Sequence, residues 1–261
     1  MLLPRILTAL IGIPLMLFLI HQGSIPFLVF VMGIIFLSLY EYRIVLICGG
    51  KEVQKYLVLG GGVFLALGTL NKNLFSPLLI LLITCSFVGE MLRNNRSLER
   101  IAMSLLGTLL IGWTLSHLFL LRNLRPYGES LTYLLVFCIW IMDSVAYFAG
   151  SWIGRKKLAP SLSPGKSWEG AMAGFLGAVG TSYGFCFLFL HGIYSGWAAL
   201  AMGSLIGIFG QISDLAESMI KRSSGVKDSG YLLPGHGGIL DRFDSFLLTT
   251  PLLYYMITFL F

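Results

Sequence analysis

The stretch Ile101–Leu121 reads IAMSLLGTLLIGWTLSHLFLL and contains no Asp, Glu, Lys or Arg between Arg100 and Arg122. A helix that crosses the hydrocarbon core of a bilayer needs about 20 predominantly apolar residues, so this stretch is long enough to cross it once. Similar runs recur along the 261 residues, of which 56% are hydrophobic and 11% are charged. Because soluble domains carry roughly a quarter charged residues, the chain is predicted to be an all-α, polytopic membrane helical bundle.

Polar residues and Gly or Pro breaks divide the chain into nine predicted spans. They are Ile6–Ile20, Phe27–Tyr40, Tyr56–Leu70, Leu74–Leu92, Ile101–Leu121, Leu131–Gly150, Ala171–Leu190, Trp197–Ser213 with a polar continuation to Arg222, and Phe246–Phe261. No internal repeat or low-complexity linker separates the halves, so residues 1–261 are predicted to form a single membrane domain. Residues 1–125 are expected to be a scaffold, and residues 126–261 to carry the catalytic spans and loops.

Lysine and arginine are unevenly divided between the two sides of this predicted bundle. With the N-terminus in the cytoplasm, Lys72, Arg122 and Arg125 fall outside, and the other 15 of the 18 fall inside. Cytoplasmic loops retain Lys and Arg preferentially, so the N-terminus is predicted inside and, with nine spans, the C-terminus outside. The net charge of +6 therefore reflects topology and indicates no nucleic-acid partner. A chain this compact is expected in a bacterial cytoplasmic (inner) membrane.

Acidic residues concentrate in the second half of the chain, where chemistry is therefore expected. On a helix, Asp214, Glu217 and Lys221 would share one face, because they are three, four or seven residues apart. A carboxylate inside a span costs at least ~2.5 kcal/mol, so such groups normally face the bundle and have a partner. The alternative is an internal pair of Asp214 or Glu217 with Lys221 that only fixes helix packing.

Two further segments, 227–230 (KDSG) and 234–244 (PGHGGILDRFD), combine glycines with charged residues. Glycines let backbone N–H groups approach a ligand, and Lys227 and Arg242 complement phosphate charge. Asp241 and Asp244 can face one another across a metal if the final helix begins there, and with Asp214 they supply the oxygen ligands that Mg²⁺ prefers. The alternative is a solvated loop with one helix-capping aspartate, which would not explain the other charged residues.

The Asp214–Lys221 face is the first polar block, and segments 227–230 and 234–244 together form the second. A third polar block runs from Asp143 in the sixth predicted span to the start of the seventh. Ser163 and Pro164 are predicted to form a turn, Lys166 to reach a phosphate, and Ser167 to open the seventh span. GxxxxGK[ST] is absent, which excludes a P-loop, and HExxH and GxSxG are absent as well.

These three blocks resemble the signature of the phosphatidate cytidylyltransferase family. The resemblance covers roughly residues 143–245, and the first five spans share only general hydrophobic character with that family. Two positions depart from its pattern: Ser213 stands where the family commonly has Gly, and Gly165 where it commonly has Lys. The resemblance implies that CTP and phosphatidate from the bilayer give CDP-diacylglycerol and pyrophosphate at a cytoplasm-facing site, with Mg²⁺ as cofactor.

The resemblance also implies roles for individual residues. Catalytic roles are expected for Lys227, Asp228, Arg242 and Asp244; substrate binding for Lys166, Ser167, Lys221, Arg222, His236, Gly237 and Gly238; and metal binding for Asp143, Asp214, Asp241 and Asp244. A second cation, monovalent or divalent, and a homodimer are options that the sequence leaves open. The rival functions are a CTP-dependent polyprenol or phytol kinase and an ion-coupled transporter that uses Asp143, Asp214 and Glu217.

Overall fold

The computed structural model describes residues 3–232 and 237–260, and the chain is built almost wholly from helices. Contacts along the backbone divide it into two compact units. The first unit contains residues 1–120 and 220–243, and the second contains residues 121–219 and 244–261. Helices α9 (Gly196–Ser223) and α10 (Leu240–Leu260) contribute residues to both units.

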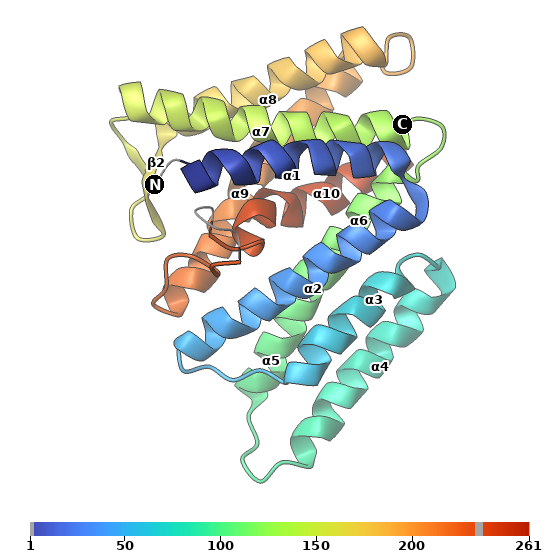
Figure 1. Cartoon of the computed structure of the whole chain (residues 1–261), viewed down its shortest axis with the longest axis vertical. Coiled ribbons are helices and arrows are strands. Elements are labelled where there is room, and N and C mark those ends of the chain that lie inside the picture. The colour runs from blue at the N-terminus through green and yellow to red at the C-terminus, as the bar shows by residue number, and fades with distance from the viewer. Residues whose placement is uncertain (1–2, 233–236, 261) are drawn as a thin grey trace. The chain divides into compact units, whose positions relative to one another are not determined.

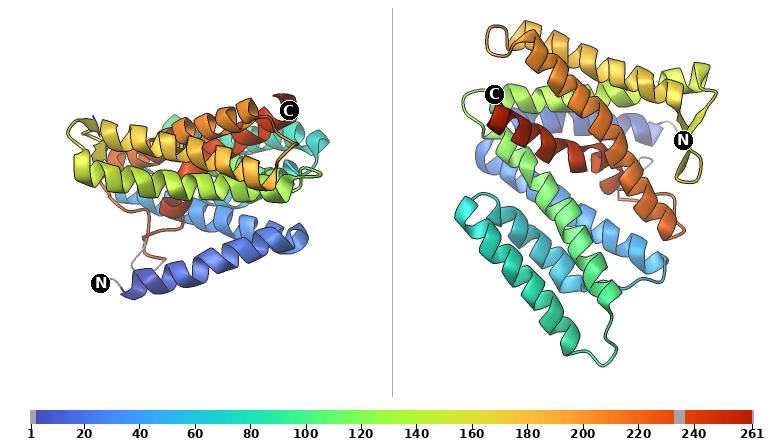
Figure 2. Two further views of the ribbon diagram at one scale, coloured as in Figure 1. Left: turned by 90° about the horizontal axis from the view of Figure 1, so that it is seen from above. Right: turned by 180° about the vertical axis from the view of Figure 1, so that it is seen from behind.

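The first unit is formed mainly by the N-terminal helices. Its elements are α1 (Leu3–Gln22), α2 (Ser24–Cys48), the π-helical turn η1 (Leu57–Gly61), α3 (Gly62–Gly68), α4 (Lys72–Met91), α5 (Leu98–Gly107), the π-helical turn η2 (Thr108–Trp113) and most of α6 (Thr114–Arg122). Helices α3 and α4 lie side by side in Figures 1 and 2. The backbones of α3 and η2 also come close together. A Cβ on Gly112 of η2 would lie 2.8 Å from the carbonyl oxygen of Gly62 in α3, so only glycine permits this approach.

A buried polar network ties α4 and α5 to the segment after α2. Glu90 and Arg100 are 3% and 6% exposed and form an ion pair. Gln54 Nε2 donates to Glu90 Oε2 at 2.8 Å, and Arg100 Nη2 contacts Glu52 Oε2 at 2.7 Å. Because an unpaired buried charge is costly, these residues stabilise the unit only as a set.

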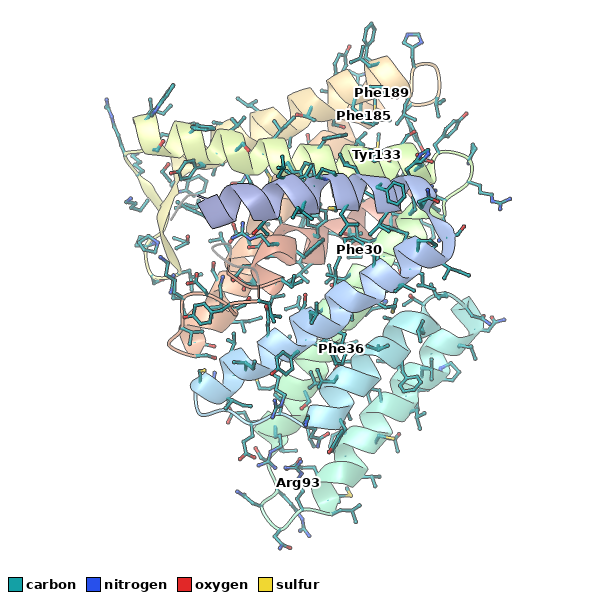
Figure 3. The ribbon with its side chains drawn as sticks, in the orientation of Figure 1. Phe30, Phe36, Arg93, Tyr133, Phe185 and Phe189 are labelled. Carbon is teal, nitrogen blue, oxygen red and sulfur yellow. The ribbon has the colours of Figure 1, made fainter. Side chains whose placement is uncertain are left out.

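The second unit is formed by the C-terminal helices. Its elements are α7 (Gly128–Ile153), the strands β1 (Lys157–Ala159) and β2 (Ser163–Ser167), α8 (Trp168–Phe189), and the parts of α9 and α10 named above. Helices α7 and α8 run along one another (Figure 1), and a Cβ on Gly174 would lie 2.9 Å from the carbonyl oxygen of Met142. In Figure 3 the rings of Phe185 and Phe189 follow one face of α8, with centroids 4.8 Å apart.

The short antiparallel hairpin between α7 and α8 is absent from the all-α prediction. Lys157 pairs with Ser167, and Ala159 pairs with Ser163. The turn lies at residues 160–162, so the prediction of a turn at Ser163 and Pro164 was wrong. Pro164 can occupy a strand here because a two-stranded hairpin leaves an edge where no N–H donor is needed.

Seven of the described helices are long and apolar enough to cross a membrane, which confirms an all-α, polytopic membrane protein. The shorter apolar helices are Leu10–Gln22 and Leu57–Gly68. Each of the nine predicted spans overlaps an observed helical segment. Nine crossings and a cytoplasmic N-terminus stay predictions.

Two helix boundaries differ from the prediction in a way that matters for function. Helix α2 continues to Cys48 instead of ending near Tyr40, and α10 begins at Leu240 instead of Phe246. Both predicted limits were placed at charged residues, which were taken to leave the apolar core. The extensions place Glu41 inside α2 and Asp241 in the first turn of α10.

Candidate functional site

A cavity of about 390 Å³ in the second unit brings together four of the predicted site residues. Its lining includes Asp143 from α7, Lys166 and Ser167 from β2, and Asp214 from α9. Helix α7, the hairpin and α9 therefore place two carboxylates, an ammonium and a hydroxyl around one space. Such a space can receive an anionic ligand together with a cation.

Lys166 and Asp214 form an ion pair within this cavity. Lys166 Nζ lies 2.5 Å from Asp214 Oδ2, and the side chains are 27% and 26% exposed. The lysine comes from β2 and the aspartate from α9, so the hairpin is what carries the lysine to its partner. Each group keeps access to solvent, so the pair can be exchanged for ligands.

Ser167 shapes the wall of the cavity through the start of α8. Its Oγ accepts a hydrogen bond from the N–H of Gly170 at 3.1 Å, which confirms that Ser167 opens this helix. A Cβ on Gly154 would lie 2.5 Å from that oxygen, so glycine leaves room for the capping serine. The hydroxyl proton of Ser167 is not needed for the cap and can serve a ligand.

Asp244 lies near enough to three other carboxylates of the second unit, those of Asp143, Asp214 and Glu217, to be repelled by their charge. Oxygen donors of this kind suit a hard divalent cation. Among the described residues, no three His, Cys, Asp or Glu side chains form a ready-made metal cage. Mg²⁺ usually takes one or two carboxylates and completes its shell with water and substrate phosphates, so these residues fit such an ion without a cage.

Ser213 joins α9 to α10 beside this group of carboxylates. Its Oγ donates to the carbonyl oxygen of Asp244 and accepts from the N–H of Leu248 at 3.1 Å. A regular α-helix pairs those same two backbone groups, so the hydroxyl contacts both partners of one step in the hydrogen-bond ladder of α10. The serine that departs from the family pattern therefore does more than allow close packing.

Asp241 is the centre of a second group of contacts, which belongs to the first unit. Lys221 Nζ lies 2.6 Å from Asp241 Oδ1, and the side chains are 10% and 9% exposed. Asp241 also accepts from the N–H of Ser229 at 3.0 Å and from the N–H of Gly238 at 2.8 Å. Lys221 therefore pairs with Asp241 and Asp214 with Lys166, two contacts that spacing along α9 does not predict.

The remaining predicted residues are placed as follows. Lys227, Asp228, Arg222 and Arg242 are exposed, and Arg222 Nη1 donates to the carbonyl of Val226 at 3.1 Å. Gly237 has a φ of +82°, a backbone conformation that favours glycine. His236 lies outside the described residues.

Glu41 is a site residue that sequence reasoning missed. Its carboxylate, 1% exposed, contacts Ser229 and the start of α10. The available signal was an acidic residue directly after a predicted span, because a charge that lies within a helix in lipid needs a partner.

The fold and these residues define a polytopic membrane protein with two lysine–carboxylate centres suited to phosphate and cation binding. The chain belongs to the cytidylyltransferase family, whose model matches residues 3–260. It is 35% identical to the phosphatidate cytidylyltransferase of Bacillus subtilis (strain 168) over 270 residues, 97% of this chain and 96% of the relative.

Other relatives match a little over half of the chain. The phosphatidate cytidylyltransferase of Brucella abortus biovar 1 (strain 9-941) is 43% identical over 148 residues, 57% of this chain and 54% of the relative. That of Synechocystis sp. (strain ATCC 27184 / PCC 6803 / Kazusa) is 42% identical over 144 residues, 52% of this chain and 45% of the relative.

Proposed function

We propose that this chain transfers the cytidylyl group of CTP to phosphatidate and so makes CDP-diacylglycerol and pyrophosphate. The observation that carries the proposal is the similarity over 97% of the chain to a relative named phosphatidate cytidylyltransferase. The contacts described above support it, because they place cationic side chains beside carboxylates, as nucleotide-phosphate chemistry requires. The same comparison favours this reaction over the kinase and transporter alternatives.

In the proposed reaction, an oxygen of the phosphatidate phosphate attacks the α-phosphorus of CTP. The new P–O bond forms in line with the P–O bond that breaks, and pyrophosphate leaves with that bond's electrons. No covalent intermediate on the protein is needed, so the side chains contribute by binding, orienting and neutralising charge. Lys166, Lys221, Lys227, Arg222 and Arg242 are the cations proposed to bind the triphosphate and the lipid phosphate.

Mg²⁺ is the proposed cofactor. Asp143, Asp214, Asp241 and Asp244 are the carboxylates proposed to bind it. When bound, the ion would neutralise phosphate charge that develops during transfer. Lys166 and Lys221 orient Asp214 and Asp241, because each lysine forms a charged hydrogen bond with its aspartate.

We further propose that the protein resides in a bacterial cytoplasmic membrane with its site facing the cytoplasm. Support comes from the 15 of 18 Lys and Arg residues that the predicted topology places on that side, and from the bacterial sources of the relatives. The soluble nucleotide would then arrive from the cytoplasm and the lipid from the inner leaflet.

Two labels of CTP distinguish cytidylyl transfer from the kinase alternative. Purified protein is incubated with Mg²⁺, phosphatidate or a lipid alcohol, and CTP labelled at either the α- or the γ-phosphate. Cytidylyl transfer moves only the α-label into lipid, and only with phosphatidate, whereas a kinase moves the γ-label into the alcohol. The α-label should stay in the aqueous phase when a chelator is added.

Two variants test the proposed metal ligands in the same assay. Asp214→Asn and Asp241→Asn proteins should remain folded and lose CDP-diacylglycerol synthesis. Near-normal turnover in both would remove the metal assignment while leaving the reaction assignment intact.

A further inference from the structure

Glu41 is an acidic side chain buried in α2, within the N-terminal half that was predicted to be only a scaffold. Its Oε1 accepts a hydrogen bond from the N–H of Ile239 at 2.9 Å. Its Oε2 accepts from the N–H of Leu240 at 2.8 Å and from the hydroxyl of Ser229 at 2.9 Å. All of these residues belong to the first unit, so the contacts lie within one compact body.

The position of this carboxylate matches the needs of a helix start. The first N–H groups of a helix have no partner within it, and a negative charge near them is favourable. Leu240 is the first residue of α10, so Glu41 caps that helix from a residue almost 200 positions earlier in the chain. The cap also gives the buried charge the partners that its burial demands.

Glycines on the facing backbone are what let the carboxylate come so close. A Cβ on Gly238 would lie 2.3 Å from Glu41 Oε2, and a Cβ on Gly230 would lie 2.7 Å from Glu41 Oε1. Neither position has room for a side chain. Two glycines of the signature therefore serve contacts with Glu41, besides any role in approaching a phosphate.

Ser229 connects Glu41 with Asp241. Its hydroxyl donates to Glu41, and its backbone N–H donates to Asp241. Asp241 also accepts a hydrogen bond from the N–H of Gly238. The next two N–H groups, those of Ile239 and Leu240, donate to Glu41. Two carboxylates thus hold the same two stretches of backbone, one around Ser229 and one at the start of α10.

We propose that Glu41 is a positioning residue for cytidylyl transfer: it fixes Ser229 and the first turn of α10, and thereby the carboxylate of Asp241. The inference rests on the proposed function for its effect on turnover, but its structural part does not. Glu41 would act without touching either substrate. Its loss should therefore loosen the start of α10 and lower turnover in the folded protein.

Glu41→Gln is the main test, with Glu99→Gln as the matched control because Glu99 is an exposed acid of the same unit. Glutamine is nearly isosteric but carries no charge, and it presents an NH₂ group to at least one backbone donor. Amide hydrogen exchange is measured on peptides that cover 237–243, and kcat and KM for CTP are measured with thermal stability as the index of folding.

We expect exchange at 239–240 to rise by about tenfold or more, because hydrogen bonds to a charged acceptor are stronger than average. The kcat/KM for CTP should fall by a similar factor, while Glu99→Gln changes neither quantity. Ser229→Ala keeps the charge and removes one contact, so it should show smaller changes in the same direction. If Glu41→Gln does not fold, the Ser229→Ala variant serves as the test of the inference.

Unchanged exchange in Glu41→Gln, or in Ser229→Ala if it is the decisive variant, would overturn the inference. So would normal kcat/KM in the folded variant of an active enzyme. If the wild-type protein makes no CDP-diacylglycerol, the proposed function fails instead, and the exchange measurement still tests the contact.

Discussion

Removing the hydroxyl of Ser213 should weaken the junction of α9 and α10. Ser213 is fully buried, and its Oγ bridges the Asp244 carbonyl and the Leu248 N–H. Ser213→Ala deletes both contacts and leaves Cβ in place. Ser213→Gly, which restores the residue common in the family, deletes the same contacts together with Cβ.

The size of the effect follows from the number of bonds. Side-chain hydrogen bonds between membrane helices are worth about 0.6 kcal/mol each, so two are worth about 1.2 kcal/mol. In the variant, Asp244 and Leu248 remain available to one another as helical partners, which would recover about half of that sum. The free energy of unfolding should therefore fall by about 0.6 to 1.2 kcal/mol, a three- to eightfold change in the unfolding equilibrium.

Removing the hydroxyl should also leave the backbone of Asp244 free to move. The hydroxyl of Ser213 holds the backbone of Asp244 next to Asp214, the residue that follows Ser213. Removing the hydroxyl should therefore change the distance between the carboxylates of Asp214 and Asp244. We therefore expect the fold-change in kcat to be larger than the fold-change in the unfolding equilibrium. A misplacement of about 1 Å near reacting groups can cost 10²-fold, and a tenfold loss of kcat is a moderate expectation.

The assay compares thermal unfolding in detergent with kcat for CDP-diacylglycerol synthesis. About 1 kcal/mol corresponds to a fall of roughly 2–4 °C in a chain of this size. Ser223→Ala is the control, because Ser223 is an exposed serine of the same helix. Wild-type kcat and melting temperature in both Ser213 variants would refute the reasoning about the bridging hydroxyl.

Three further substitutions separate binding from stability. Lys166→Met should change the melting temperature little, because an ion pair that is more than a quarter exposed contributes about 1 kcal/mol or less to stability. It should nevertheless lower kcat/KM about 100-fold, because the phosphate contact is lost. Near-normal kcat/KM would contradict this prediction. Gly238→Ala places a Cβ 2.0 Å from Ser229 Oγ and should cost about 1–3 kcal/mol and most activity, whereas Gly165→Ala, with nothing within 4 Å, should be neutral; equal activity in the two would contradict the steric argument. Arg100→Met leaves Glu90 buried without its ion-pair partner and should destabilise by about 3–5 kcal/mol in a thermal unfolding measurement, an expectation that an unchanged melting temperature would rule out.

The hydrophobic runs predicted where helices form, because a long apolar segment in lipid must satisfy its backbone hydrogen bonds internally and a helix does so. Charged residues were less easily interpreted. The predicted span Phe27–Tyr40 stopped before Glu41 and the span Phe246–Phe261 began after Asp241, yet both acids lie inside helices. A charge inside lipid requires a partner, and one sequence does not say where that partner will be. Both boundary errors therefore fell at residues with long-range contacts.

The partners of the predicted site residues were the part that could not be predicted. Asp214 and Lys166 lie 48 positions apart, and Lys221 and Asp241 lie 20 apart. Spacing along one helix offered a pair within α9 only as an alternative, because only local geometry can be worked out from sequence. The hairpin that carries Lys166 depends on backbone pairing over three- and five-residue strands, which gave no hydrophobic alternation to detect.

The two lysine–aspartate pairs suggest how a membrane protein can keep a charged site intact without substrate. An isolated carboxylate next to lipid is costly, so a site of bare aspartates would be destabilising whenever the nucleotide is absent. Lys166 on Asp214 and Lys221 on Asp241 remove that cost. Both lysines are also proposed to bind phosphate, so arrival of a nucleotide with its cation would let each lysine exchange a carboxylate for a phosphate oxygen. Each aspartate and each lysine would then have an oppositely charged partner in both states, so binding would require side-chain movement but would leave neither group unpaired.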